Sequence, residues 1–190
     1  MRCGRWLVLL ALPLSSLAWA EHARPVAIDT EHSVIGFEIR TRYGQRLKGR
    51  FPVFSGQVQT LADGRQQVRL DIDARHAQIQ GYRRYTGWLR SEQFFDVRHH
   101  PMIAFRSAPH AAGLAHTGGE VEGELTLRGV SGGIRMVVDS SECETPGYDC
   151  PVAGRGTVSR AAYGMDGWQV VVGDRVTFVL QIRLHRADPS

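Results

Sequence analysis

Near the carboxyl end of the chain, apolar residues recur at every second position in Val176-Thr177-Phe178-Val179-Leu180-Gln181-Ile182-Arg183-Leu184-His185. Successive side chains of a β-strand point to opposite faces of its sheet, so this period of two places Val176, Phe178, Leu180, Ile182 and Leu184 on one face. The stretch predicts a long strand with one buried face and one face in water.

The same alternation occurs along most of the chain. It is clear over residues 35–39, 68–73 and 121–128, and further strands are expected near 47–60, 101–107, 134–140, 152–159 and 168–173. Turn-forming groups such as Ala62-Asp63-Gly64 and Thr117-Gly118-Gly119 separate them, as hairpin connections do. The pattern predicts an all-β sandwich or a closed antiparallel β-barrel of about eight strands. Its inner face is rich in Phe, Ile, Leu and Val, so the interior is either a dry core or a container for an apolar molecule.

One segment, near 82–95, departs from this period. Tyr82, Tyr85, Trp88 and Leu89 fall at helical spacing, which predicts a short amphipathic helix over 82–90 and a turn of helix at 92–95. Such an insertion is expected to cap one opening of the barrel with its aromatic residues. The alternative is a covering helix with a solvated basic face. In either case its arginines are expected to face outward, namely Arg83, Arg84 and Arg90.

The amino terminus predicts export. Arg2 and Arg5 precede an apolar run, and Ala18-Trp19-Ala20 supplies small residues at the spacing of a cleavage site. The apolar run is shorter than the ~20 residues of a membrane-spanning helix. Residues 1–20 are therefore a predicted secretory signal peptide, cleaved before Glu21. Residues 21–190 have the length of one domain, which we expect to be exported.

The net charge argues against nucleic acid as a partner. The formal charge is +4 for the whole chain and becomes +2 without residues 1–20, because these contain two arginines and no acidic residue. The basic residues are scattered and lack the interleaved aromatic residues of a single-strand binding groove.

Two cysteines, Cys143 and Cys150, remain outside the leader. An even number of cysteines in an exported chain predicts a disulfide, and Pro146-Gly147 between them suits a tight turn. The alternative is a two-thiol metal site, which lacks two nearby partner ligands.

The pattern offers little for catalysis. Asp71 and Asp73 are expected on the outward face of one strand, where paired carboxylates are usually just solvated. Ser33 next to His32 lacks a third group to orient the pair and the strained turn of a nucleophilic serine. We therefore expect no catalytic residue.

Asp96, His99 and His100 are candidate metal ligands. Adjacent residues of an extended segment point to opposite sides, so one cation cannot easily take both histidines. We expect a polar surface turn here, with no metal and no cofactor.

Several sequence blocks occur together in one known family. They are Ile28-Asp29-x-x-His32-Ser33-x-Ile35-x-Phe37, Gly49-Arg50-Phe51-x-x-Phe54-x-Gly56, Leu89-Arg90-Ser91-x-x-Phe94-Phe95-Asp96, His100-Pro101-x-Ile103-x-Phe105-x-Ser107, Gly123-x-Leu125-Thr126-Leu127-Arg128-Gly129-Val130-Ser131 and Arg160-x-x-Tyr163-Gly164-Met165. In this order and spacing the chain resembles the YceI-like family of bacterial periplasmic proteins, over essentially all of residues 21–190.

The resemblance implies a lipocalin-like antiparallel barrel that holds a long apolar molecule, typically a polyisoprenoid or an isoprenoid quinone. Thr41 stands where members of the family commonly have His. The residues expected to line the barrel or its portal are Phe37, Ile39, Phe51, Phe54, Tyr82, Tyr85, Trp88, Leu89, Phe94, Phe95, Phe105, Leu125, Leu127 and Tyr163.

Three functions remain as hypotheses. The first is an exported, non-enzymatic binding or transport protein for an isoprenoid lipid, with transient contact to a membrane surface. The second is a periplasmic stress-response or redox-partner interaction module with a filled core. The third, a metal-dependent hydrolase, requires His and carboxylate groups that converge in a pocket. An elongated apolar tunnel would favour the first hypothesis, and a filled barrel the second.

Overall fold

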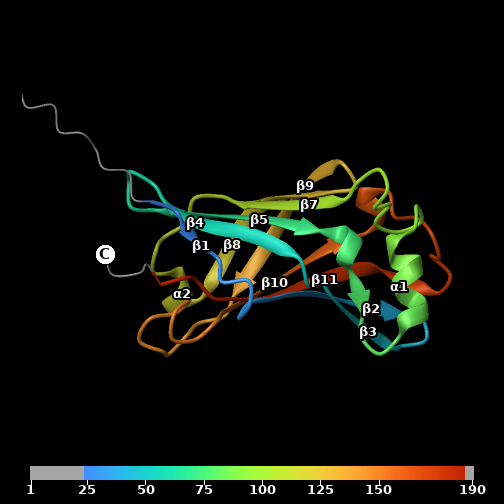
Figure 1. Cartoon of the computed structure of the whole chain (residues 1–190), viewed down its shortest axis with the longest axis horizontal. Coiled ribbons are helices and arrows are strands. Elements are labelled where there is room, and N and C mark those ends of the chain that lie inside the picture. Colours follow the sequence, from blue (N-terminus) through green and yellow to red (C-terminus); the bar gives the residue numbers. More distant parts are fainter. Residues whose placement is uncertain (1–23, 187–190) are drawn as a thin grey trace, which may run out of the picture.

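The computed structural model describes residues 24–186 of the chain, which form a curled β-sheet with a helix at each end (Figure 1). The predicted signal peptide, residues 1–20, lies outside the described residues. Within 24–186, no helix is long and apolar enough to cross a membrane.

The sheet has eleven strands, and every strand pairing in it is antiparallel. The strands are β1 (Val26–Ala27), β2 (Val34–Thr41), β3 (Arg46–Arg50), β4 (Phe54–Thr60), β5 (Gln66–Asp73), β6 (Gln78–Ile79), β7 (Met102–Ser107), β8 (Gly119–Leu127), β9 (Val130–Val138), β10 (Val152–Ser159) and β11 (Val172–Ile182). Their spatial order is β1-β4-β5-β7-β8-β9-β10-β11-β2-β3-β6. The predicted all-β antiparallel fold is confirmed.

The predicted number of strands, about eight, is wrong. Residues 47–60 form two strands instead of one, because Pro52 between β3 and β4 has no N–H to donate to a ladder. Most of residues 168–173 form a turn, in which Trp168 adopts a positive φ of 61°. The two-residue strands β1 and β6 are too short to carry an alternation.

The barrel is closed by hydrogen bonds at one end. There β1 pairs with β4, and the residues that follow it contact the end of the chain. The Asp29 N–H donates to the Arg183 carbonyl at 2.9 Å and the His185 N–H to the Ala27 carbonyl at 3.0 Å. At the other end the outermost strand is the short β6, and a helix lies over the opening.

That helix is α1 (Arg83–Arg90), which agrees with the prediction for 82–90. Leu89 is buried and Tyr85 packs against the core. Residues 92–95 form hydrogen-bonded turns rather than a turn of helix. The prediction for Arg90 is wrong, because its guanidinium is half-buried and donates to the Ala77 carbonyl at 3.2 and 3.3 Å. Arg84 does face water.

A second helix, α2 (Leu114–Thr117), lies at the opposite end of the barrel (Figure 1). Its four residues are too few to show a helical period, so this helix was not predicted from the sequence. Thr117-Gly118-Gly119 therefore ends a helix instead of joining a hairpin. Two 3-10 turns, η1 (Ala74–His76) and η2 (Ala161–Tyr163), complete the described elements.

Large apolar side chains fill the interior because small residues lie opposite them. A Cβ at Gly49 would be 2.1 Å from the ring of Phe37, so glycine lets that ring lie flat against β3. Phe37 packs at 5.2 Å from Phe51 and 5.9 Å from Phe95, measured between ring centroids. The expected inward face of the final strand is also found, with Val176 and Phe178 buried.

Asp73 does not lie on the wet face of β5 with Asp71, as predicted. It is only 6% exposed, at the point where the strand passes into η1. Its carboxylate accepts hydrogen bonds from the Arg75 backbone at 2.9 Å and from the Arg75 guanidinium at 2.7 Å. Mainly through the side-chain bond to Arg75, the pKa of Asp73 falls to about 2.

The predicted disulfide between Cys143 and Cys150 is present. The loop that it closes follows β9 and lies at the same end of the barrel as α2. The Leu184 N–H donates to the Gly147 carbonyl at 2.7 Å, and the Arg183 guanidinium donates to the Tyr148 carbonyl at 2.9 Å. The disulfide loop is thereby fixed to the end of the last strand.

Candidate functional site

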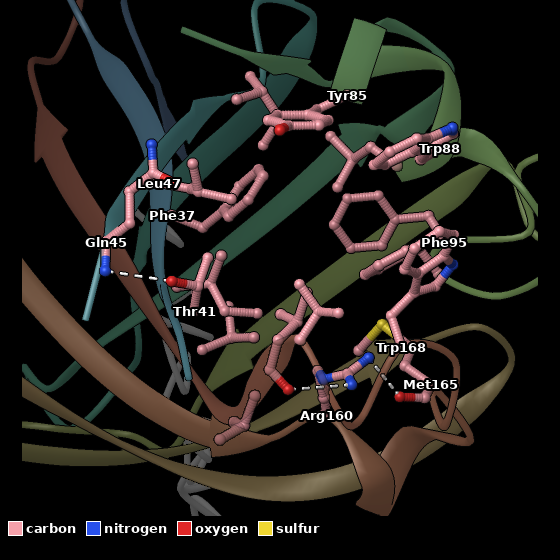
Figure 2. Close-up of a pocket in the computed structure, with 18 of the residues that line it drawn as sticks. Phe37, Thr41, Gln45, Leu47, Tyr85, Trp88, Phe95, Arg160, Met165 and Trp168 are labelled. Atoms are coloured by element: carbon pink, nitrogen blue, oxygen red, sulfur yellow. Dashed lines mark hydrogen bonds between the residues drawn. The ribbon is translucent and has the colours of Figure 1, made fainter. Parts of the chain in front are cut away.

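An apolar cavity of about 320 Å³ lies under α1, at the end of the barrel where the hydrogen bonding is open. Figure 2 shows Phe37, Leu47, Tyr85, Trp88 and Phe95 gathered around it. We call this space the α1 cavity. Its size is at the lower end of the range usual for ligand pockets, about 300–1,000 Å³, and its lining is mainly aromatic and aliphatic.

Stacked aromatic rings lie along the mouth of the α1 cavity. Ring centroids are 5.3 Å apart for Tyr82 and Tyr85, 4.9 Å for Tyr85 and Trp88, and 4.9 Å for Trp88 and Trp168. Trp168 belongs to the loop before β11 and also donates its indole N–H to the Gln93 side-chain oxygen. Side-chain stacking thus joins α1 to a loop nearly eighty positions later in the chain.

Few polar groups face the α1 cavity, and those near its mouth are bonded to one another. The Gln45 N–H donates to the Thr41 hydroxyl at 3.1 Å, and the Gln45 side-chain amide donates to the Tyr82 hydroxyl at 3.0 Å. The first of these bonds is visible in Figure 2. A ligand here therefore meets hydroxyl and amide groups at the mouth and hydrocarbon inside.

Arg160 is the charged residue in the wall of the cavity, and it is 1% exposed. Its guanidinium donates to the carbonyls of Met165 at 2.7 Å and Gly173 at 3.1 Å, with a longer contact of 3.5 Å to Val172. Burial lowers the pKa of Arg160, against the opposing effect of Asp174 and Asp166. A guanidinium has five N–H donors and these contacts use three, so Arg160 keeps hydrogen-bonding capacity.

A second apolar cavity, of about 260 Å³, lies at the other end of the barrel, under α2 and the disulfide loop. We call it the α2 cavity. It shares no lining residue with the α1 cavity. Buried side chains that line neither cavity separate the two, and we call this set the central layer: Ile35, Phe51, Ile72, Ile103, Leu125 and Ile134. The interior is neither one continuous tunnel nor a filled barrel.

The predicted ligand-binding residues divide between these parts. Those that line the α1 cavity are Phe37, Ile39, Tyr85, Trp88, Leu89, Phe94, Phe95 and Leu127. Phe51 and Leu125 belong to the central layer, and Phe105 lines the α2 cavity. The remaining three, Phe54, Tyr82 and Tyr163, line neither cavity.

Arg160 and Trp168 belong to the cavity wall but were not predicted there. For Arg160 a signal existed, because it is two residues beyond the inward-facing Val158 of β10. Strand parity therefore points it inward. For Trp168 there is no such signal, since a turn outside any periodic segment brings it to Trp88. Three further lining residues, on the hairpin that β2 and β3 form, were not predicted either: Tyr43, Gln45 and Leu47.

The groups considered for nucleophilic catalysis have structural partners. The Ser33 hydroxyl accepts from the Arg183 N–H at 2.8 Å, and His32 Nδ1 lies 2.7 Å from the Asp29 carboxylate. Among the described residues that line the α1 cavity there is no His, Asp or Glu. The convergent pocket that a hydrolase requires is not formed there.

The candidate metal ligands form a polar turn. His99 Nδ1 lies 2.9 Å from the Asp96 carboxylate, and a ligand atom of Glu92 lies within 4.8 Å of both. His100 packs instead against Gly129. Glu92 and His99 are exposed and Asp96 is already bonded to His99, so we assign no metal to this group.

Comparison with known families agrees with this architecture. The profile of the YceI-like domain matches residues 27–184, which is nearly all of the described chain. The chain belongs to the YceI-like family. No curated protein sequence matches it.

Solved structures of similar fold include other YceI-like proteins. BcnA from Burkholderia cenocepacia has a TM-score of 0.62 and 20% identity, over 82% of this chain and 98% of BcnA. A domain from Saccharophagus degradans, described as polyisoprenoid-binding and implicated in plant cell wall breakdown, has a TM-score of 0.62 and 19% identity, over 85% of this chain and 100% of that domain. A mutant YceI protein from Campylobacter jejuni has a TM-score of 0.50 and 13% identity, over 73% of this chain and 85% of that protein. At these identities the similarity establishes the fold alone.

Proposed function

We propose that this protein is an exported, non-enzymatic carrier that binds an isoprenoid lipid, such as a polyisoprenoid or an isoprenoid quinone, in the α1 cavity. The observation that carries the proposal is an apolar cavity at the open end of the barrel, covered by a helix through aromatic stacking. The Saccharophagus degradans domain, described as polyisoprenoid-binding, has the same fold. Membership of the YceI-like family, whose members are typically periplasmic, supports the location.

The size of the cavity limits how much of the lipid it encloses. A methylene-sized group needs roughly the 30 Å³ of a water molecule in the liquid. By this measure, a volume of about 320 Å³ takes on the order of ten carbons, or two isoprene units. The rest of a longer chain extends through the mouth.

The free energy of transfer favours a carrier over a permanent store. Moving a chain out of water is worth about 0.8 kcal/mol per methylene-sized group, but the competing environment is a bilayer of similar polarity. The hydrophobic contribution then nearly cancels, and the preference depends on shape and on a few polar contacts. Arg160, Thr41 and Gln45 are positioned to make such contacts with a carbonyl or hydroxyl head.

The rim of the mouth suits brief contact with a membrane surface. Tyr43 is 85% and Val170 81% exposed there, beside the partly exposed Trp88 and Trp168. Aromatic residues favour the interface of a bilayer, and the exposed Arg84 on α1 favours anionic headgroups.

The direct test is mass spectrometry of an organic extract of protein purified from its source organism. We expect one isoprenoid per chain. In Val171→Phe the new ring enters the α1 cavity, so lipid content should fall at least ten-fold. The matched control Val137→Phe, on the outer face of β9, should retain it. Absence of stoichiometric lipid from the unaltered protein would contradict the proposal and favour the interaction module.

A further inference from the structure

The α2 cavity is separated from the α1 cavity by the order of inward-facing residues along the strands. On β11, Val176 and Phe178 line the α1 cavity, whereas Leu180 and Ile182 line the α2 cavity. On β8, Leu127 lines the α1 cavity and Val121 lines the α2 cavity. Leu125, which belongs to the central layer, lies between these two residues along the strand. Each strand thus contributes to both spaces, with a packed layer between.

We propose that the α2 cavity is a second binding site, for a small amphipathic alcohol of about eight to ten carbons. This goes beyond the isoprenoid site at the other end. At roughly 30 Å³ per methylene-sized group, a volume of about 260 Å³ takes some eight or nine carbons. Most of the lining is aliphatic, including Val68, Leu114 and Leu184.

His110 gives this site a hydrogen-bonding group. Its backbone is fixed by a reciprocal pair of hydrogen bonds with Gln66, at 2.8 and 2.9 Å. In its ring, Nδ1 lies 3.1 Å from the Ala108 carbonyl. A carbonyl only accepts, so Nδ1 is the donor in this bond, and in that tautomer Nε2 is an acceptor. Nε2 has no partner among the described residues, and a ligand hydroxyl satisfies it.

The serine next to this histidine is already committed to the fold. The Ser107 hydroxyl accepts from the Val68 N–H at 2.9 Å and lies 3.4 Å from His110 Nδ1. It is 2% exposed. Ser107 therefore orients the wall and the imidazole rather than bonding the ligand, and His110 Nε2 selects a donor such as an alcohol.

The end of the site is covered by two short segments. Leu114 and Ala115 of α2 form one side, and Thr145, Pro146 and Tyr148 of the disulfide loop form the other. The Ser141 N–H donates to the His116 carbonyl at 3.3 Å, which joins these two segments. The loop is held by the disulfide and by Arg183, so the site has a preformed cover.

Titration calorimetry with 1-octanol tests the proposal. In Val171→Phe, where the α1 cavity is blocked, we expect one 1-octanol per chain. Adding Ala115→Phe, which fills the α2 cavity from α2, should abolish that binding. Ala112→Phe fills the same cavity from a residue that precedes α2. Either of the two substitutions can be used for the test if the other variant fails to fold. Circular dichroism melting curves identify the folded variants. Binding that survives in folded fillers would overturn the proposal.

The hydroxyl contact is tested with 1-methoxyoctane, which has the same chain but no donor. The unaltered site should prefer 1-octanol roughly five-fold, as expected for one net hydrogen bond. His110→Phe should remove that preference. Equal affinities before the substitution would overturn the assignment of His110.

A last comparison separates this site from the isoprenoid site. Protein loaded with a long prenol should still bind 1-octanol, because the central layer keeps the cavities apart. Displacement of one by the other would show that the α2 cavity is the far end of a single lipid tunnel, and would overturn the proposal. The 1-octanol titrations use no isoprenoid, so they are independent of whether the protein carries one.

Discussion

Two single residues show where strand parity predicts burial correctly and where it does not. Asp73 alternates with the buried Ile72 and belongs by parity with the exposed Asp71, yet it is buried because β5 turns into η1 at that residue. Arg160 has inward parity and is buried despite its charge, since backbone carbonyls of the segment 165–173 satisfy its guanidinium. Parity therefore fails for Asp73, at the last position of β5, but still holds for Arg160, just beyond the end of β10.

The lowered pKa of Asp73 makes a prediction about acid stability. With a pKa of about 2 in the folded protein, against an ordinary value near 3.8, the carboxylate stabilises the fold above pH 4. That contribution is lost as the pH falls toward 2. Asp73→Asn should lower the free energy of unfolding by about 1–2 kcal/mol at pH 7, allowing for the exposed side of Arg75. At pH 2 it should change that free energy little.

Urea unfolding at both pH values measures this difference. Asp71→Asn is the matched control, because Asp71 lies on the exposed face of the same strand and should show almost no change at either pH. A cost for Asp73→Asn that is equal at pH 7 and pH 2 would mean that the carboxylate charge does not contribute.

At the scale of elements, α1 and the loop before β11 act together. The helix could be expected from the spacing of Tyr82, Tyr85 and Trp88, because amphipathic helices carry a strong local period. The stacking of this helix on Trp168 could not be expected from the sequence. It depends on a contact between two segments that share no sequence pattern. The half-buried Arg90 is not part of the solvated face of α1, whereas Arg84 is exposed and bears on membrane contact.

The charge on α1 should control lipid transfer. We expect Arg83→Glu/Arg84→Glu to slow transfer to anionic vesicles at least ten-fold at low salt, since each basic residue near such a surface contributes about 1 kcal/mol. At 0.5 M salt, where screening acts within about 5 Å, the variant and the unaltered protein should become similar. Stopped-flow transfer of a fluorescent prenol lipid measures both rates.

The control for this prediction is Arg24→Glu/Arg106→Glu, which changes the net charge equally at exposed positions that line neither cavity. It should transfer lipid at nearly the original rate. Equal slowing of both variants would assign the effect to overall charge, and α1 would then be an ordinary covering helix.

For the molecule as a whole, the central layer sets how long a chain can be enclosed. Phe51 lies in its middle, 5.2 Å from Phe37 and 6.4 Å from Phe178 between ring centroids. Phe51→Ala should destabilise the protein by about 3–5 kcal/mol and connect the two cavities. We therefore expect a twenty-carbon prenol to gain affinity relative to a ten-carbon prenol, measured by competition in calorimetry.

Val176→Ala is the control for this prediction. It enlarges the α1 cavity without opening the layer, so the preference between the two prenols should change little. A Phe51→Ala protein that stays folded and shows no gain for the longer prenol would mean that the layer does not limit chain length.

The sequence by itself determined the antiparallel β-fold, α1, the disulfide and the inward faces of the long strands. Each of these depends on a local period or on residue chemistry that acts over a few positions. Only the tertiary structure decided that Trp168 meets Trp88, that Arg160 bonds the segment 165–173, and that Phe51 divides the interior into two cavities. The physical reason is that close packing depends on which strands are neighbours and on how their side-chain volumes match across the barrel. The alternation along a single strand specifies neither its neighbours nor this match of volumes.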